Sequence, residues 1–134
     1  AELPPFEANK LTSDPRRYAR NMALTRTFRE LGLGGPTVAW VRAACIASRK
    51  VSTLAFRESF RIPTLFIAAG ADEVVLRQAV EDYARSLRTG RLVTIDGARH
   101  EILQEADLYR EQALAAFDAF VPGSNADRYA VTEA

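Results

Sequence analysis

The stretch IPTLFIAA, residues 62–69, decides the fold class of this chain. It is a nearly unbroken apolar run, and such runs are typical of a parallel strand that helices cover on both faces. Pro63 is compatible with a strand here because it stands at the strand's first position, where proline is tolerated. The run therefore predicts a parallel β-strand over residues 62–69.

The sequence after this run alternates between helical and strand patterns. Apolar residues at helical spacing indicate helices, and a short β-branched run between them indicates a strand. The expected elements are a helix over residues 76–87, a strand over 91–95, a loop over 96–100 and a helix over 109–121. Strand, helix, strand and helix in this order predict a βαβ unit with a trailing helix, and so the α/β fold class.

Two parallel strands do not make a complete sheet. A sheet of this size is not stable alone, and its open edges would invite association. Residues 1–61 contain no convincing strand. We therefore expect the remaining strands to come from an upstream part of the same polypeptide or from another chain.

Residues 1–61 read as an irregular lead-in followed by helices. Asp14-Pro15 predicts a helix start, because Asp caps backbone N–H groups and proline suits the first helical position. We expect this helix to end at Gly32, a second helix to follow Pro36, and a short helix to span residues 53–60. The second helix has an apolar face that we predict to be buried, formed by Val38, Trp40, Val41, Ala44, Cys45 and Ser48.

Two further expectations concern the surface and the end of the chain. The five arginines between Arg16 and Arg29 are predicted to form a solvated face, with contact to anionic lipid headgroups as a minor alternative. Residues 122–134 show no periodicity and are predicted to be a mobile tail.

Composition excludes several classes of protein. The chain has 134 residues, 48% hydrophobic and 26% charged, which is typical of one globular domain. A formal net charge of +1 gives no electrostatic reason to expect a nucleic-acid partner. The single cysteine, Cys45, excludes an internal disulfide and a multi-cysteine zinc site. A single cysteine fits a cytoplasmic location, with membrane association as an alternative. No apolar run reaches the roughly 18–20 residues that span a bilayer.

Two ionisable residues stand just past the expected strands. Asp72 lies three residues after Ala69, and His100 lies five residues after Ile95. Ligands of open α/β sheets bind outside the carboxyl ends of the strands, where loops from neighbouring strands open at one rim. A carboxylate within reach of an imidazole fixes its tautomer and stabilises the imidazolium when the ring takes a proton from a nucleophile. Asp72 and His100 are therefore candidate catalytic residues.

Other interpretations of these two residues stay open at this point. Asp72 is also well placed to cap a helix that begins near Val74. His100, the one histidine of the chain, is also compatible with an ordinary surface loop. A zinc site is rejected, because HEILQ (residues 100–104) begins like a zincin motif but has Gln where the second His ligand belongs.

The neighbouring acidic residues offer alternative partners for His100. Glu73 follows Asp72 directly, and Asp96 follows the second expected strand. Asp96 precedes Gly97, which is more typical of a turn residue than of a catalytic acid.

Four segments together resemble the α/β-hydrolase superfamily, in particular its bacterial lysophospholipase and monoacylglycerol-lipase-like branch. The resemblance covers residues 9–121. The segments are LTSDPRRYARN (residues 11–21), LGGPT (33–37), AGADEVV (69–75) and GARHEIL (97–103). The resemblance implies that the chain is the C-terminal portion of this fold, contributing its last two parallel strands.

The resemblance also implies roles. The family's catalytic order is Ser, Asp, His, which places the acid at Asp72 and the base at His100. Residues 1–61 would form the lead-in and the helical cap, with residues 33–40 near the acyl-binding side, and residues 62–121 would belong to the core. No metal or organic cofactor is implied. The expected substrate is a lipid ester, a lysophospholipid or a monoacylglycerol.

The nucleophile is the missing part. The family's Gly-x-Ser-x-Gly elbow should precede Asp72, yet no serine before it has the flanking glycines: Ser13, Ser48, Ser52 and Ser59. We therefore expect an upstream part of the protein to carry the serine, and this chain to be inactive alone. Alternatives are another α/β-hydrolase chemistry, such as that of an epoxide hydrolase, haloperoxidase or aminopeptidase, or a non-catalytic association module.

Overall fold

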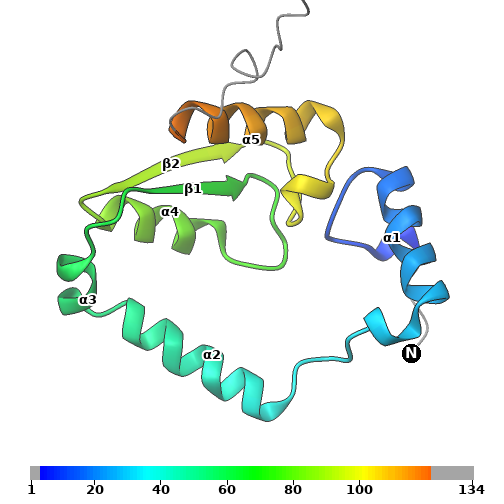
Figure 1. Cartoon of the computed structure of the whole chain (residues 1–134), viewed down its shortest axis with the longest axis horizontal. Coiled ribbons are helices and arrows are strands. Elements are labelled where there is room, and N and C mark those ends of the chain that lie inside the picture. Colours follow the sequence, from blue (N-terminus) through cyan, green and yellow to red (C-terminus); the bar gives the residue numbers. More distant parts are fainter. Residues whose placement is uncertain (1–3, 122–134) are drawn as a thin grey trace, which may run out of the picture.

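The computed structural model describes residues 4–121 and shows a two-stranded sheet between two helices, with an arc of further helices beside it (Figure 1). The helices and strands are α1 (Pro15–Thr27), α2 (Val38–Val51), α3 (Leu54–Ser59), β1 (Thr64–Ala69), α4 (Arg77–Ser86), β2 (Gly90–Ile95) and α5 (Asp107–Phe120). Short 3-10 turns lie at η1 (Phe6–Ala8), η2 (Arg29–Leu31) and η3 (Ile102–Gln104).

The two strands pair in parallel, from Thr64 opposite Gly90 to Ala69 opposite Ile95. They therefore end level with each other, and the loops that follow them leave at the same rim. Within residues 4–121 neither strand has a second partner. The predicted βαβ unit and the parallel pairing are confirmed.

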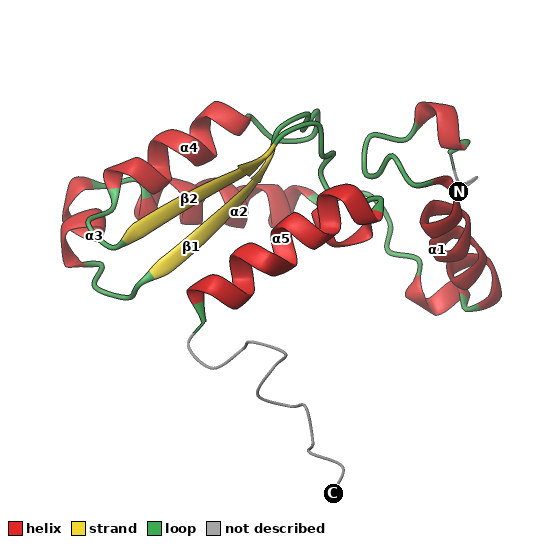
Figure 2. Ribbon diagram, turned by 90° about the horizontal axis from the view of Figure 1, so that it is seen from above, coloured by secondary structure: helices red, strands yellow, loops and turns green. Residues whose placement is uncertain are grey.

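The sheet is covered on its two faces by different helices (Figure 2). Because side chains alternate along a strand, Phe66 faces α4, where its ring meets that of Tyr83 at 6.0 Å. Ile67 and Ala69 face α5, where Ala69, Ile95, Ala98 and Ala113 form the buried core. Covering on both faces is what the apolar run of residues 62–69 predicts.

The depth of burial along β1 is less than the apolar run predicts. Only Ala68 and Ala69 are buried, while Thr64 to Ile67 are half-buried. The physical reason is the open edge of β1. Among the described residues no further strand lies beside this edge, so the side chains of β1 are left partly uncovered there.

The first helix begins as predicted and ends earlier. Asp14 caps it, with Oδ1 accepting hydrogen bonds from the amides of Arg16 at 2.8 Å and Arg17 at 3.0 Å. The α-helix ends at Thr27, and the 3-10 turn η2 carries the chain to Gly32. Gly32 has φ −79°, so the expectation of a glycine that ends the helix itself is wrong.

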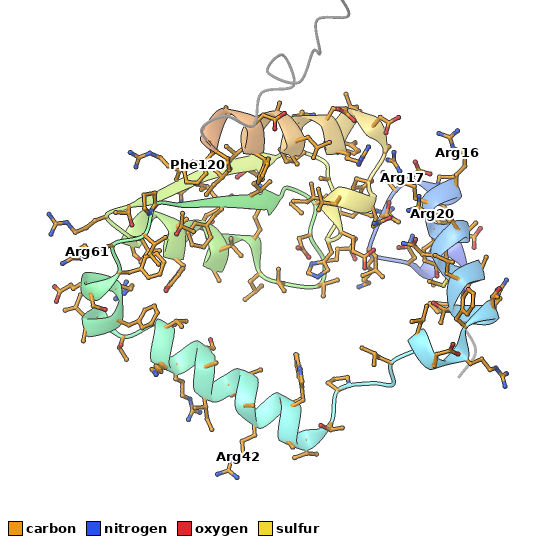
Figure 3. All side chains as sticks on the ribbon, viewed as in Figure 1. Arg16, Arg17, Arg20, Arg42, Arg61 and Phe120 are labelled. Carbon is orange, nitrogen blue, oxygen red and sulfur yellow. The ribbon has the colours of Figure 1, made fainter. Side chains whose placement is uncertain are left out.

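The predicted burial of the α2 face is wrong. The helix follows Pro36 as predicted, with Thr37 as its N-cap, but none of its residues is buried. Trp40 is 64% exposed and Cys45 is exposed. An amphipathic pattern predicts which side of a helix is apolar, but it does not predict which element covers that side. Among the described residues no element buries the apolar side of α2. Arg42 of this helix points outward (Figure 3).

The short helix predicted around residues 53–60 is confirmed by α3. The proposed division into a cap segment (residues 1–61) and a core (62–121) stays a prediction. The tail, residues 122–134, lies outside the described residues.

Candidate active site

Asp72 lies in the loop after β1 and uses its two carboxylate oxygens for different partners. Oδ1 accepts hydrogen bonds from the amides of Val74 at 2.7 Å and Val75 at 3.0 Å. Oδ2 lies 2.9 Å from Nδ1 of His100. The capping interpretation and the histidine-partner interpretation therefore both describe this side chain, although α4 itself begins only at Arg77.

The electrostatics keep Asp72 ionised at neutral pH. Burial raises its pKa, since its side chain is only 6% exposed. The hydrogen bonds from His100, Val75 and Val74 outweigh burial and hold the pKa below the ordinary value of an Asp. The carboxylate is therefore available as an acceptor for the imidazole.

The His100 ring is partly exposed. Its side chain is 34% exposed. With Nδ1 directed at Asp72, Nε2 has no hydrogen-bond partner among the described residues. A carboxylate at Nδ1 favours the tautomer with hydrogen on Nδ1, which leaves Nε2 as a proton acceptor.

The backbone holds the two loops together. The amide of Gly70 donates to Ile95 O at 2.9 Å, and the amide of Ala71 donates to Ala98 O at 2.8 Å. A Cβ at Gly70 would lie 2.8 Å from both Asp96 Cα and Ile95 O. Gly70 is therefore required for the close approach that brings the acid loop to the histidine loop.

Replacing Gly70 with Ala should separate these loops. We expect Gly70→Ala to destabilise the full-length protein by about 1–3 kcal/mol, the usual cost of overpacking, because the added methyl group meets backbone that cannot rotate away. The measurement is the free energy of unfolding by urea. Gly34→Ala is the matched control, since nothing lies within 4 Å of its added Cβ. Equal stabilities for the two variants would contradict the close approach.

The alternative partners of His100 are engaged elsewhere. Glu73 pairs with Lys10, with 3.2 Å between Nζ and Oε2. Asp96 is exposed and forms a turn with Gly97, whose φ is +79°, as the turn interpretation predicts. Within residues 4–121 no group of three or more His, Cys, Asp and Glu side chains gathers as a metal site.

The four serines before Asp72 make no hydrogen bond to His100. Ser13 bonds to Glu105 at 2.5 Å, and Ser59 donates to Phe56 O at 2.8 Å. Ser48 lies on α2 and Ser52 at its end. Among the described residues, none of these four serines is hydrogen-bonded to the imidazole.

Sequence reasoning missed the contacts behind the histidine loop. Glu105 is fully buried, and its side chain reaches residues 12–13 and the amide of Arg99. Arg17, predicted to be part of a solvated face, points toward η3 and α5, while Arg16 points away (Figure 3). Nη2 of Arg17 lies 2.5 Å from Oδ1 of Asp107. No local signal predicts the pairs of Glu105 with Ser13 and of Arg17 with Asp107, because their members lie about 90 positions apart.

An apolar groove of about 640 Å³ adjoins the histidine loop. It lies between β1, η3 and α5. Its lining residues are Ile67, Glu101, Ile102, Leu103, Gln104, Ala113, Leu114 and Phe117.

Comparison with known proteins gives the class of this protein. A family model described as serine aminopeptidase, S33, matches residues 3–107. The parallel βαβ unit is consistent with a C-terminal portion of the α/β-hydrolase fold. The chain belongs to the serine aminopeptidase S33 family of α/β-hydrolases.

Two curated relatives carry the name lysophospholipase L2, one of them as a probable lysophospholipase L2. Lysophospholipase L2 of Escherichia coli (strain K12) is 37% identical over 124 residues, which covers 87% of this chain and 36% of the relative. Probable lysophospholipase L2 of Haemophilus influenzae is 27% identical over 116 residues, with the same coverage. The chain thus spans about a third of the length of these relatives.

These similarities confirm the expected fold class and the lysophospholipase-like branch. No solved structure matches the chain. Among the described helices, none combines the length and the apolar character needed to cross a bilayer.

Proposed function

We propose that this chain supplies the catalytic acid, Asp72, and the catalytic base, His100, of a lysophospholipase-like serine ester hydrolase. The nucleophilic serine lies in polypeptide outside this chain, and the chain alone does not hydrolyse esters. The observation that carries the proposal is the 2.9 Å contact between Asp72 Oδ2 and His100 Nδ1 at the carboxyl ends of two parallel strands.

The geometry suits general base catalysis. As the serine oxygen attacks the acyl carbonyl, Nε2 of His100 takes the hydroxyl proton, and Asp72 stabilises the resulting imidazolium. The tetrahedral intermediate collapses, the ester C–O bond breaks, and His100 returns the proton to the departing alcohol. Water then repeats the sequence on the acyl-enzyme and releases the fatty acid. Oδ1 of Asp72 stays bound to the amides of Val74 and Val75 throughout, which fixes the direction of Oδ2.

The lipid ester substrate is proposed from the names of the relatives. Both are named as lysophospholipases, so a lysophospholipid is the first choice and a monoacylglycerol the second. Residues 1–61 would form the cap over the acyl chain, and the location would be cytoplasmic or at a membrane surface.

A fluorophosphonate probe tests the proposal, because it reacts with an activated serine. We expect the full-length protein to be labelled once, at a serine upstream of residue 1 within a Gly-x-Ser-x-Gly sequence, and to lose lysophospholipid hydrolysis in step with labelling. Pre-incubation with lysophospholipid should protect it. Absence of such a serine, or hydrolysis that persists after complete labelling, would contradict the proposal.

A second candidate activity is aminopeptidase, which the description of the matching family favours. An amino-acid anilide assayed beside the lysophospholipid separates the two. Preferred turnover of the anilide would assign Asp72 and His100 to peptide hydrolysis instead, by the same proton transfers.

A further inference from the structure

We infer that Glu105 is a positioning residue for His100, and that it anchors the histidine loop to the segment that leads into α1. The inference rests on the proposed function of His100. It assigns a role to the one fully buried acidic side chain of the described residues, which the catalytic steps above do not use.

The carboxylate of Glu105 joins two distant segments. Oε1 accepts the amide of Arg99, the residue directly before His100, at 2.7 Å. Oε2 accepts the amide of Ser13 at 2.9 Å, its hydroxyl at 2.5 Å, and the amide of Ala106 at 3.1 Å. One oxygen therefore holds the histidine loop while the other holds the residues before α1.

The surrounding contacts reinforce this junction. The guanidinium of Arg99 donates to Asn9 O at 3.0 Å and Thr12 O at 3.3 Å. The amide of Glu101 donates to Leu11 O at 2.8 Å. The residues on both sides of His100 are thus bonded to residues 9–13, and only the imidazole side chain is left to face Asp72.

The charge of Glu105 matters to these contacts. Burial raises its pKa, but the hydrogen bonds from the Ser13 hydroxyl and from the amides of Arg99, Ser13 and Ala106 hold the pKa below the ordinary value of a Glu. Backbone amides can only donate. A carboxamide at this position has only one acceptor oxygen. Its NH₂ group would therefore face N–H donors, either at Arg99 or at Ser13 and Ala106, with which it cannot form a hydrogen bond.

Glu105→Gln in the full-length protein tests the inference. We expect kcat for lysophospholipid to fall about 10–100-fold, the usual effect of misplacing a catalytic group by about an ångström, with KM changed less than about twofold. The control is Glu111→Gln, an exposed glutamate on α5, which should keep the wild-type kcat. Assays are run well below the unfolding temperature of each variant.

A double-mutant cycle separates positioning from general stability. If Glu105 acts through His100, adding Glu105→Gln to His100→Ala should cause no further loss of kcat. An equal loss in both backgrounds, or a wild-type kcat for Glu105→Gln, overturns the inference. Full activity of His100→Ala alone would instead overturn the proposed function, so the two failures are distinguishable.

Ser13→Ala replaces the test if Glu105→Gln does not fold. It removes the 2.5 Å hydroxyl contact with Oε2 and leaves the carboxylate and the Arg99 amide in place. We expect Ser13→Ala to lower kcat for lysophospholipid. A cooperative urea unfolding transition of this variant shows that it is folded. A wild-type kcat for this variant overturns the inference.

Discussion

Replacing His100 with Ala should reduce kcat/KM of the full-length protein for a lysophospholipid by about 10⁴–10⁶-fold, since members of a catalytic triad act as a unit. The loss should fall on kcat, because the imidazole transfers protons rather than binding the acyl chain. His100 is 34% exposed, so the truncation leaves no large cavity in the core, and the urea midpoint should stay close to that of the wild type.

Chemical rescue provides the control for His100→Ala. Free imidazole should restore part of the turnover by entering the space left by the ring, since Asp72 is still present to orient it. The same imidazole should not raise the activity of the wild type. Turnover that is unchanged by the substitution would remove His100 from the mechanism.

Replacing Asp72 with Asn should lower kcat by about 10³–10⁴-fold, the size of effect seen when a triad carboxylate becomes an amide. The carboxamide oxygen can still accept the amides of Val74 and Val75, so the loop keeps its shape. Its NH₂ group then faces Nδ1 and favours the tautomer with hydrogen on Nε2, which cannot accept a proton from serine.

The pH dependence of stability gives a second measurement on Asp72→Asn. The pKa of Asp72 is lowered in the folded state, so its stabilising contribution is fully present above its unfolded pKa of about 3.9. The contribution is lost as pH falls through the lowered folded pKa. The difference in urea midpoint between wild type and variant should therefore shrink as the pH falls below about 4. A difference that grows in this acidic range would contradict this assignment of the charge.

The position of the candidate pair could be predicted from the sequence because strand ends are local features. The apolar run to Ala69 and the run to Ile95 mark where two strands stop, and parallel pairing places those stops level. Whatever follows within a few residues then lies at one rim. The placement of Asp72 and His100 at one rim follows from this rule once the pairing is known.

The support of the pair could not be predicted in the same way. Glu105 follows a 3-10 turn and shows no pattern that distinguishes it from an exposed glutamate. Its contacts with Ser13 and Arg99 depend on how the segments pack together, which hydrophobic periodicity does not predict. The open face of α2 is a similar case, since periodicity gives the apolar side of a helix and not the element that covers it.

The network around Glu105 also bears on when the site can form. Ser13 and Glu105 are separated by 92 positions. Closing so long a loop costs chain entropy, and this entropy is lost before the contacts at the junction can form. The strands and their helices can assemble from neighbouring sequence, whereas the shape of the histidine loop must wait for residues 9–13 to arrive. On this basis the orientation of the imidazole is fixed later in folding than the local contacts of the βαβ unit.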